Sequence, residues 1–316
     1  MKTSNAKRPI LVTGSNRSGT TWVGKMLCQS NELRYIHEPF NSSNWPRLLG
    51  VRLGGHYTYV CAENEARYVG PMSDLLRSRP RLAGQVVEIR GRRDVLKLGR
   101  HSVEAMEGLV RRRRPMLKDP IALFSTPWLA DRFNVQPVVM IRHPAAYVSS
   151  VSRLGWRFDF GYLLSQDLLM RDLLAPFRDE VEVMAARGDD ATPFEQAMLL
   201  WRLKYDVVDR WREEHPEWVF LRYEDLAADP LVGFEQLYGR LGLTFDARAA
   251  AGIESFTGEG NAKERPTSEA HNVKRDSRAA RWAWLKRLSP DEIGRIREGV
   301  GAISDRFYTG EEWSPA

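Results

Sequence analysis

One short stretch near the start of the chain, residues 10–22, limits the folds that the sequence can adopt. It begins with the apolar residues 10–12, which are typical of a buried strand in a parallel sheet. Gly14 and Gly19 then bracket a loop, and the residues that follow are typical of a helix. A strand, a glycine-bracketed loop and a helix direct backbone N–H groups and the positive end of the helix at an anion. The stretch therefore predicts an α/β fold with an anion site after its first strand.

The loop has the glycine spacing of a nucleoside triphosphatase but lacks the cation that such an enzyme needs. In those enzymes a lysine follows the second glycine and reaches the β- and γ-phosphates, and the next Ser or Thr binds Mg²⁺. Here Thr20 and Thr21 follow Gly19, and the cation is Arg17, inside the loop. The loop can hold a phosphate group, but the usual arrangement for a triphosphate and its metal is missing.

A second strand end favours the same kind of ligand. Residues 137–141 are predominantly apolar, Arg142 follows them, and Pro144 is typical of the first turn of a helix. In enzymes that hydrolyse nucleoside triphosphates, a strand of this kind ends in an Asp for Mg²⁺. An arginine in that place favours an anion and gives no help to a metal. Ser150 lies about two turns into the predicted helix.

The loop residues from Asn16 to Trp22 resemble the 5′-phosphosulfate-binding loop of sulfotransferases that use 3′-phosphoadenosine 5′-phosphosulfate (PAPS). Arg142 and Ser150 resemble the 3′-phosphate-binding pair of that family. Carbohydrate-type and many bacterial members carry Arg where this chain has Arg17, whereas cytosolic members carry Lys. The resemblance implies a P-loop-type fold and transfer of a sulfonate group from PAPS to a hydroxyl group, with no metal required.

Two later segments extend the resemblance. Residues 222–226 resemble the family, and Tyr223 is either a contact to the edge of the adenine or a packing residue. Residues 261–281 resemble the last nucleotide-contacting loop, which closes over the 3′-phosphate and adenine; without ligand they are alternatively a disordered linker. The contacts to PAPS, or to its product 3′-phosphoadenosine 5′-phosphate (PAP), that the resemblance implies are Asn16, Arg17, Ser18, Gly19, Thr20, Thr21, Trp22, Arg142, Ser150, Tyr223, Lys274, Arg275 and Ser277.

A short predicted strand that is stopped by Pro39 places Glu38 at its end. Proline favours an extended backbone at the residue before it, and ligands bind beyond the carboxyl ends of strands in such sheets. Family members place a catalytic glutamate shortly after the first helix, often as Glu-Pro. The resemblance therefore implies that Glu38 is the general base that takes the proton of the acceptor hydroxyl. The alternative is that Glu38 only forms an ion pair with Arg17 or Arg34.

Three neighbours of Glu38 in the predicted sheet are further candidates. His37 is a rival base because cytosolic members use a histidine, but successive strand residues point to opposite faces, so only one of the two is expected in the cleft. Asp119 precedes a proline and is typical of an N-cap, and it ranks below Glu38 as a base. Lys118 is either a cation for the sulfonate or bridging oxygen, together with Arg17, or a partner in a structural ion pair.

The segment 41–114 matches no motif and is assigned to acceptor binding by elimination. Residues 92–114 are typical of a charged surface helix, whose arginine run 111–114 is either a solvated helix end or a site for an anionic acceptor. The aromatic residues of the segment are either stacking surfaces for sugar rings or core residues: Trp45, Tyr57 and Tyr59.

Composition and length bound the remaining possibilities. The 316 residues are expected to form one domain, residues 1–316, in which helices flank a central parallel sheet and a helical insertion or cap is added. A formal charge of +6 suits an anionic ligand. The arginines are scattered apart from one run, and no known nucleic-acid-binding pattern occurs, so nucleic acid is not expected as a partner. The two cysteines give neither a disulfide framework nor metal-ligand spacing.

The sequence predicts where the protein is located but leaves the identity of the acceptor open, together with two alternative functions. The chain has no apolar run that could span a membrane, which predicts a cytoplasmic protein and leaves peripheral membrane contact open. Similarity to carbohydrate-type members implies an acceptor hydroxyl on a carbohydrate, a glycolipid or a glycosylated metabolite. The alternative functions are a small-molecule kinase with a degenerate P-loop and a non-catalytic nucleotide-binding protein.

Overall fold

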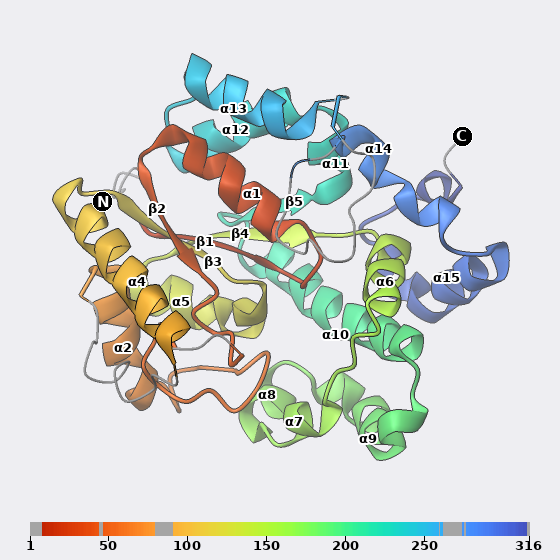
Figure 1. Ribbon diagram of the computed structural model, residues 1–316. Helices are drawn as coiled ribbons and strands as arrows, with labels where there is room; N and C mark the ends of the chain where they lie inside the picture. Colours follow the sequence, from red (N-terminus) through yellow and green to blue (C-terminus); the bar gives the residue numbers. More distant parts are fainter. Residues whose placement is uncertain are drawn as a thin grey trace.

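The computed structural model describes residues 8–43, 47–79, 91–258, 260–261, 274 and 276–314, without the side chains of residues 93, 97, 100, 101, 104 and 109. Within these residues, a parallel sheet of five strands has the order β2-β3-β1-β4-β5 (Figure 1). The strands are β1 Ile10–Gly14, β2 Leu33–His37, β3 Arg114–Lys118, β4 Gln136–Ile141 and β5 Val219–Arg222. The α/β class and the parallel sheet that the apolar runs predict are therefore confirmed.

The strand register brings the candidate residues to one edge of the sheet. Val12 of the central strand β1 is level with Lys118 of β3 on one side and with Val138 of β4 on the other. Lys118 is in turn level with His37 of β2. Because all these strands are parallel, their carboxyl ends meet at one edge, which is where sheets of this kind bind ligands.

Helices cover both faces of the sheet (Figure 1). Ile10 and Val12 pack with α1, α11, α12 and α13 on one face. Leu11 points to the other face, with α2 and α5. Beyond β4 that face continues into a larger core with α6, α10 and α15. The α-helices are α1 Thr20–Leu27, α2 Ala66–Leu76, α4 Arg92–Val110, α5 Thr126–Phe133, α6 Pro144–Arg153, α7 Phe160–Leu164, α8 Asp167–Asp172, α9 Arg178–Arg187, α10 Pro193–Glu214, α11 Tyr223–Ala228, α12 Pro230–Leu241, α13 Ala247–Thr257, α14 Ser277–Arg281 and α15 Pro290–Ser304.

Short 3₁₀ helices connect several of these elements. They are η2 Cys28–Ser30, η3 Pro120–Ser125, η4 Ala175–Phe177, η5 Gly188–Asp190, η6 Ala283–Lys286 and η7 Gly310–Trp313. The helix ends follow local sequence signals. Thr192 forms a capping box with Glu195 at the start of α10, which fixes the beginning of this long helix.

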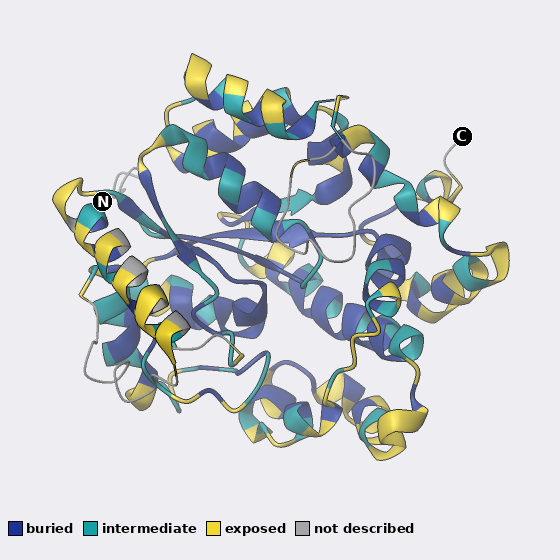
Figure 2. Ribbon diagram, viewed as in Figure 1, coloured by how far each residue is buried: buried dark blue, intermediate teal, exposed yellow. Residues whose placement is uncertain are grey.

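Helices α7, α8 and α9 lie close together beside α10 (Figure 1). The strands are mostly buried, whereas α4 and α9 expose much of their surface (Figure 2). Of the helices in the described ranges, none has both the length and the apolar character to cross a membrane.

Candidate active site

The loop between β1 and α1 closes in a tight turn. Both the backbone N–H and the hydroxyl of Ser18 donate hydrogen bonds to the carbonyl of Ser15, at 3.1 Å and 2.6 Å. Arg17 has a φ of +66°, a left-handed conformation that is uncommon for residues other than glycine. Successive residues in right- and left-handed conformations turn backbone N–H groups toward one point, which favours an anion.

The two bracketing glycines are required by their surroundings. Gly14 has a φ of +139°, and a Cβ there would lie 2.4 Å from the carbonyl oxygen of Met140. Gly19 has a φ of +97°, and a Cβ there would lie 2.7 Å from the ring of Tyr223. Each glycine thus provides both a left-handed backbone and close packing.

The side chain of Arg17 contacts α6. Its Nε donates a 2.9 Å hydrogen bond to Oγ of Ser150, and its guanidinium lies 5.8 Å from the ring centre of Trp156. The resemblance assigns Arg17 to the phosphosulfate end of the nucleotide and Ser150 to the 3′-phosphate end. The structure brings these two side chains into direct contact.

Asn16 is held by three donors that come from separate parts of the chain. Its Oδ1 accepts hydrogen bonds from the hydroxyl of Tyr57 at 2.8 Å, the hydroxyl of Tyr147 at 3.2 Å and Nζ of Lys204 at 3.1 Å. Tyr147 lies on α6 and Lys204 on α10. These donors fix the amide, and the opposite arm of the side chain carries its NH₂ group.

Lys204 is a functional candidate that the sequence analysis missed. It is fully buried, its Nζ also donates to the hydroxyl of Tyr147 at 3.1 Å, and it lies 4.4 Å from the ring centre of Tyr57. In the described ranges it has no ion pair with a carboxylate, and burial holds the pKa of its amine well below the usual value. The available signal was a lysine within the buried stripe of an amphipathic helix, next to Leu203.

A buried ion pair lies at the ends of β2 and β3. The ammonium of Lys118, whose side chain is 1% exposed, pairs with the carboxylate of Glu38. The other oxygen of Glu38 accepts a 2.7 Å hydrogen bond from Nδ2 of Asn41. Helix α1 covers the stem of Lys118 so closely that a Cβ on Gly24 would lie 3.1 Å from its Cγ. Burial raises the pKa of Glu38, but Lys118, His37 and Asn41 together hold it below its usual value.

Two geometric expectations for Glu38 are wrong. Its backbone is not extended but has a φ of +47°, because its N–H donates to the carbonyl of Lys118 and its own carbonyl accepts from the N–H of Asn41. The resulting turn also keeps His37 on the same side, with its Nε2 3.9 Å from the carboxylate of Glu38. The two candidate bases therefore lie together. Glu38 forms an ion pair with Lys118.

Asp119 is an N-cap, as the sequence predicts. Its Oδ1 accepts hydrogen bonds from the N–H groups of Ile121 and Ala122 at 3.0 Å and 3.2 Å, and its Oδ2 accepts one from the N–H of Phe40 at 2.6 Å. The side chain is fully buried, and burial, followed by the charge of Glu38, raises its pKa to about 7. By holding Phe40, Asp119 fixes the turn that carries Glu38.

Arg142 follows β4 and contacts a buried acid. Its guanidinium lies 3.6 Å from the ring centre of Tyr223, and its Nε lies 3.4 Å from Oε1 of Glu224. Glu224 also accepts hydrogen bonds from the hydroxyl of Tyr308 at 2.9 Å and the N–H of His143 at 3.2 Å. The carboxylate of Glu224 thus supplies the negative charge next to Arg142 in this structure.

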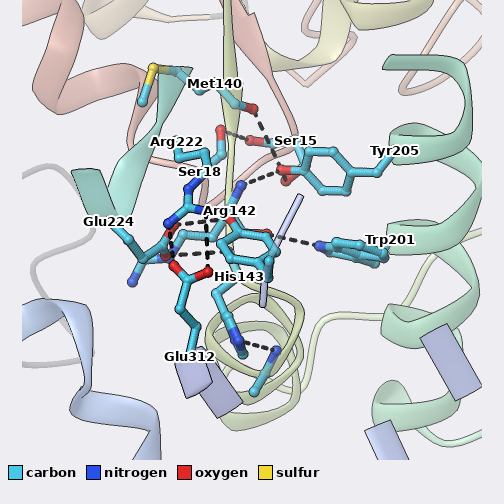
Figure 3. A network of polar contacts seen from close by, with 12 residues as sticks. Ser15, Ser18, Met140, Arg142, His143, Trp201, Tyr205, Arg222, Glu224 and Glu312 are labelled. Atoms are coloured by element: carbon cyan, nitrogen blue, oxygen red, sulfur yellow. Dashed lines mark hydrogen bonds and ion pairs between the residues drawn. The ribbon is translucent and has the colours of Figure 1, made fainter. Parts of the chain in front are cut away.

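The backbone of Arg142 is tied to the loop through α10 (Figure 3). Its N–H donates to the hydroxyl of Tyr205 at 3.0 Å, and its carbonyl accepts from Nε1 of Trp201 at 2.9 Å. The hydroxyl of Tyr205 also lies 3.2 Å from Oγ of Ser15. Tyr205 therefore joins the two predicted anion-binding segments, which the sequence analysis did not foresee.

Several predicted contacts are packed residues. Thr20 is buried and Thr21 half-buried in the first turn of α1. Trp22 is buried with its ring centre 5.3 Å from that of Tyr223, which is itself fully buried. The packing alternative for Tyr223 is therefore observed, and its contact with adenine stays a prediction. Tyr57 is likewise a core residue, since its ring is 2% exposed.

The predicted closing loop is described only in part. Ser277 begins α14 and is buried, with its hydroxyl 3.4 Å from the carbonyl oxygens of Ala227 and Thr257. Lys274 is exposed. Arg275 and Trp45 lie outside the described residues. Half-buried Tyr59 donates a 3.0 Å hydrogen bond to Asp172. In the described ranges, no three acidic, histidine or cysteine side chains gather as metal ligands would.

The fold and the loop define an α/β protein with an anion-binding type of turn after its first strand. No model of a known protein family matches the chain. In sequence it is similar to carbohydrate sulfotransferase 4 of Mus musculus, with 23% identity over 95% of this chain and 82% of that protein. The chain thus resembles a sulfotransferase over nearly its whole length, as the loop motif predicts.

Solved structures with a similar chain trace include two sulfotransferases. The sulfotransferase domain from the curacin biosynthetic pathway has a TM-score of 0.45 and 16% identity, covering 94% of this chain and 99% of that domain. Sulfotransferase STF9 from Mycobacterium avium has a TM-score of 0.45 and 14% identity, covering 96% of this chain and 77% of that one.

Proposed function

We propose that this chain is a sulfotransferase that moves a sulfonate group from PAPS to a hydroxyl group of an acceptor. The observation that carries the proposal is the position of the ion pair between Glu38 and Lys118, at the same sheet edge as the loop of Arg17. A carboxylate, a cation and an anion-binding type of turn therefore lie around one edge, which supports the proposal. The sequence similarity to carbohydrate sulfotransferase 4 supports the same reaction.

The residues at this edge fit a ligand with two anionic ends. The loop offers backbone N–H groups at the start of α1 and the guanidinium of Arg17. At the end of β4, Nε of Arg142 is buried and, within the described ranges, makes no hydrogen bond, although Glu224 lies near it. We assign the 5′-phosphosulfate to the loop from Asn16 to Thr21 and the 3′-phosphate to Arg142 and Ser150.

PAPS, when bound, supplies the sulfonate group that becomes joined to the acceptor oxygen. Glu38 is the group that takes the acceptor proton, and its lowered pKa keeps it ionised at neutral pH. Such a weak base accepts a proton once the attacking hydroxyl has become acidic, late in the transfer. Protonation of Glu38 also removes the negative charge beside Lys118. Lys118 and Arg17 then neutralise the negative charge that develops on the leaving oxygen.

Lys204 and Tyr205 support the loop between β1 and α1 through hydrogen bonds. Lys204 holds the side chain of Asn16, and Tyr205 links Ser15 to the backbone of Arg142. Both residues lie on α10, which is anchored in the largest core. A rigid support of this kind keeps the donors in place before the ligand binds, which is what electrostatic stabilisation requires.

The acceptor is proposed from the resemblance. A hydroxyl of a carbohydrate, a glycolipid or a glycosylated metabolite fits the carbohydrate-type relative. Residues 41–114 are assigned to the acceptor side of one domain, residues 1–316, and Tyr57 of this segment bonds to Asn16. The kinase alternative is not favoured, because Arg142 stands where a metal-binding Asp is needed.

Transfer of labelled sulfonate from PAPS to a panel of hydroxyl acceptors tests the proposal. The expected result is a labelled sulfate ester with at least one acceptor, and loss of the product with Arg17→Ala. A protein that binds PAP but transfers sulfonate to no acceptor class would instead be a non-catalytic nucleotide-binding protein.

A further inference from the structure

The outer face of α4 is apolar. Of the nine large hydrophobic side chains that are exposed in the described part of the chain, five lie on this one helix, with 53% to 77% of their surface exposed. They are Val95, Leu96, Val103, Met106 and Val110. Single exposed hydrophobic residues are ordinary, but a group of five on one element is typical of a surface that binds a protein, a membrane or a ligand.

These five side chains follow the spacing of a helix face. Successive members are separated by three, four or seven residues, apart from the adjacent pair Val95 and Leu96. The opposite face is used by the fold: Leu98 and Ala105 are buried, and a Cβ on Gly108 would lie 2.2 Å from Cδ of Arg34. The exposed stripe is therefore additional to the core face. The expected surface helix is thus present over Arg92–Val110, and it carries an apolar stripe that was not expected.

Arginines stand at both ends of the stripe. Arg92 begins α4, and Arg111 and Arg112 follow its last residue; all three are exposed. Arg111 forms an ion pair with Glu107 at 3.2 Å. Arg114, the last of the run, is buried and starts β3, so the run is only partly a solvated helix end. An apolar helix face with basic residues at its ends is typical of helices that lie in the surface of an anionic membrane.

The helix lies next to the candidate acceptor side. Gly108, near the end of α4, lies against Arg34 at the start of β2, and α4 runs antiparallel to β2, so its first turns lie toward the carboxyl ends of the strands (Figure 1). Figure 1 shows α4 alongside β2, the strand that leads into Glu38. A flat surface that holds α4 would therefore also adjoin the edge that carries Glu38.

Charge favours a lipid surface over a second copy of this chain. Parallel pairing of two such helices would place each arginine end against the same end of its partner. Antiparallel pairing would place Arg92 against Arg111 and Arg112. Either arrangement brings like charges together, whereas anionic lipid headgroups neutralise both ends at once.

We propose that α4 binds the surface of an anionic lipid bilayer and that this bilayer carries the hydroxyl acceptor. The second half of this statement rests on the proposed sulfotransferase function, whereas the first half does not. A helix of 19 residues is about 28 Å long, so the stripe offers enough length for several side chains to enter the interface together.

Sedimentation of the full chain with vesicles tests the bilayer contact without any enzymatic readout. The protein is expected to bind vesicles of phosphatidylcholine and phosphatidylglycerol, and to bind phosphatidylcholine vesicles weakly. Leu96→Glu and Met106→Glu should each reduce binding by about tenfold or more, because a carboxylate replaces an inserted apolar group. The double change of Arg111 and Arg112 to Gln should remove most of the preference for anionic lipid.

Val183→Glu is the matched control, because Val183 is also an exposed apolar residue, 62% exposed, but lies on α9. Its binding should equal that of the wild type. Absence of vesicle binding, or equal binding by Leu96→Glu and the wild type, would overturn the proposal. The proposal would also be overturned if the wild type does not bind vesicles but forms a dimer in light scattering, and the Leu96→Glu variant is a monomer.

Calorimetry with PAP on the same proteins separates this proposal from the proposed function. Leu96→Glu should bind PAP as the wild type does, which also shows that the variant is folded. If no protein binds PAP but vesicle binding still depends on Leu96, the sulfotransferase proposal fails and the bilayer contact stands. If the protein binds PAP but does not bind vesicles, the bilayer proposal fails and the sulfotransferase proposal stands.

Discussion

The amine of Lys204 lies 3.1 Å from the side-chain oxygen of Asn16, the residue that precedes Arg17 in the loop. A lysine that is fully buried without a carboxylate partner in the described residues costs stability. Such a cost is expected where the group serves a ligand, since natural proteins keep unfavourable groups mainly at functional sites.

Replacement of Lys204 by Met therefore separates stability from binding. Lys204→Met keeps the length of the side chain and removes the buried amine, so the melting temperature should stay the same or rise. PAP should bind about tenfold more weakly, because the hydrogen bond that holds the loop residue Asn16 is lost. Calorimetry and thermal unfolding measure the two effects. The exposed Lys286→Met is the control, and unchanged PAP affinity in Lys204→Met would remove Lys204 from the site.

Glu38→Gln tests the assignment of the base. The amide oxygen can still accept a hydrogen bond from Lys118, so the fold should survive, but the side chain no longer accepts a proton. The kcat should fall by about 10²–10⁴, as for other general bases, while the affinity for PAP should stay within about twofold of the wild type. Steady-state kinetics and calorimetry measure these values. A nearly normal kcat would transfer the role of base to His37 or Asp119.

The pH dependence of kcat distinguishes the same candidates. The pKa of Glu38 is held below 4.5, so this base stays ionised and should give no loss of activity between pH 8 and about pH 5. Burial raises the pKa of Asp119 to about 7, so a base at that position would lose activity as the pH falls below 7. A decline in kcat between pH 7 and pH 6 would exclude Glu38 as the base.

The lowered pKa of Glu38 also determines how the stability of the protein changes with pH. Since the pKa of Glu38 is lower in the folded protein than in the unfolded chain, its contribution to stability is complete above its unfolded value of about 4.5. The contribution is lost as the pH falls through the lower, folded value. Urea unfolding at pH 3 to 6 should show a smaller loss of stability in Glu38→Gln than in the wild type. An identical pH dependence in both proteins would contradict the ion pair.

Gly19→Ala tests the turn itself. The new Cβ would lie 2.7 Å from the ring of Tyr223 in a residue with a φ of +97°, so the unfolding free energy should fall by about 1–3 kcal/mol. Gly239→Ala is the matched control, because nothing lies within 4 Å of a Cβ there. Gly239 lies inside α12, where alanine should stabilise by about 0.5–1 kcal/mol. If urea unfolding gives the same change in unfolding free energy for both variants, the prediction for Gly19 is wrong and the loop accommodates the new Cβ.

The sheet and the loop could be predicted from the sequence because their signals are local. Apolar runs mark the strands, and Gly14 and Gly19 mark a turn that needs left-handed backbone. The backbone of Glu38 could not be predicted, since its φ depends on a hydrogen bond to Lys118, 80 residues away. The same holds for Lys204, whose partner Asn16 is distant in sequence, and for Arg142, whose nearby acid Glu224 lies on α11. The apolar residues of the α4 stripe can be read from the sequence, but charged residues lie between them, so the segment has the composition of a charged helix.

Titration of the purified chain with PAP, without added metal, tests the central claim most directly. The account predicts binding of one PAP per chain, weakened at least about tenfold by Arg142→Ala, in keeping with a charge-assisted contact to a phosphate. It also predicts sulfonate transfer from PAPS that Arg17→Ala nearly abolishes. A chain that binds neither PAPS nor PAP but binds magnesium ATP would contradict the account.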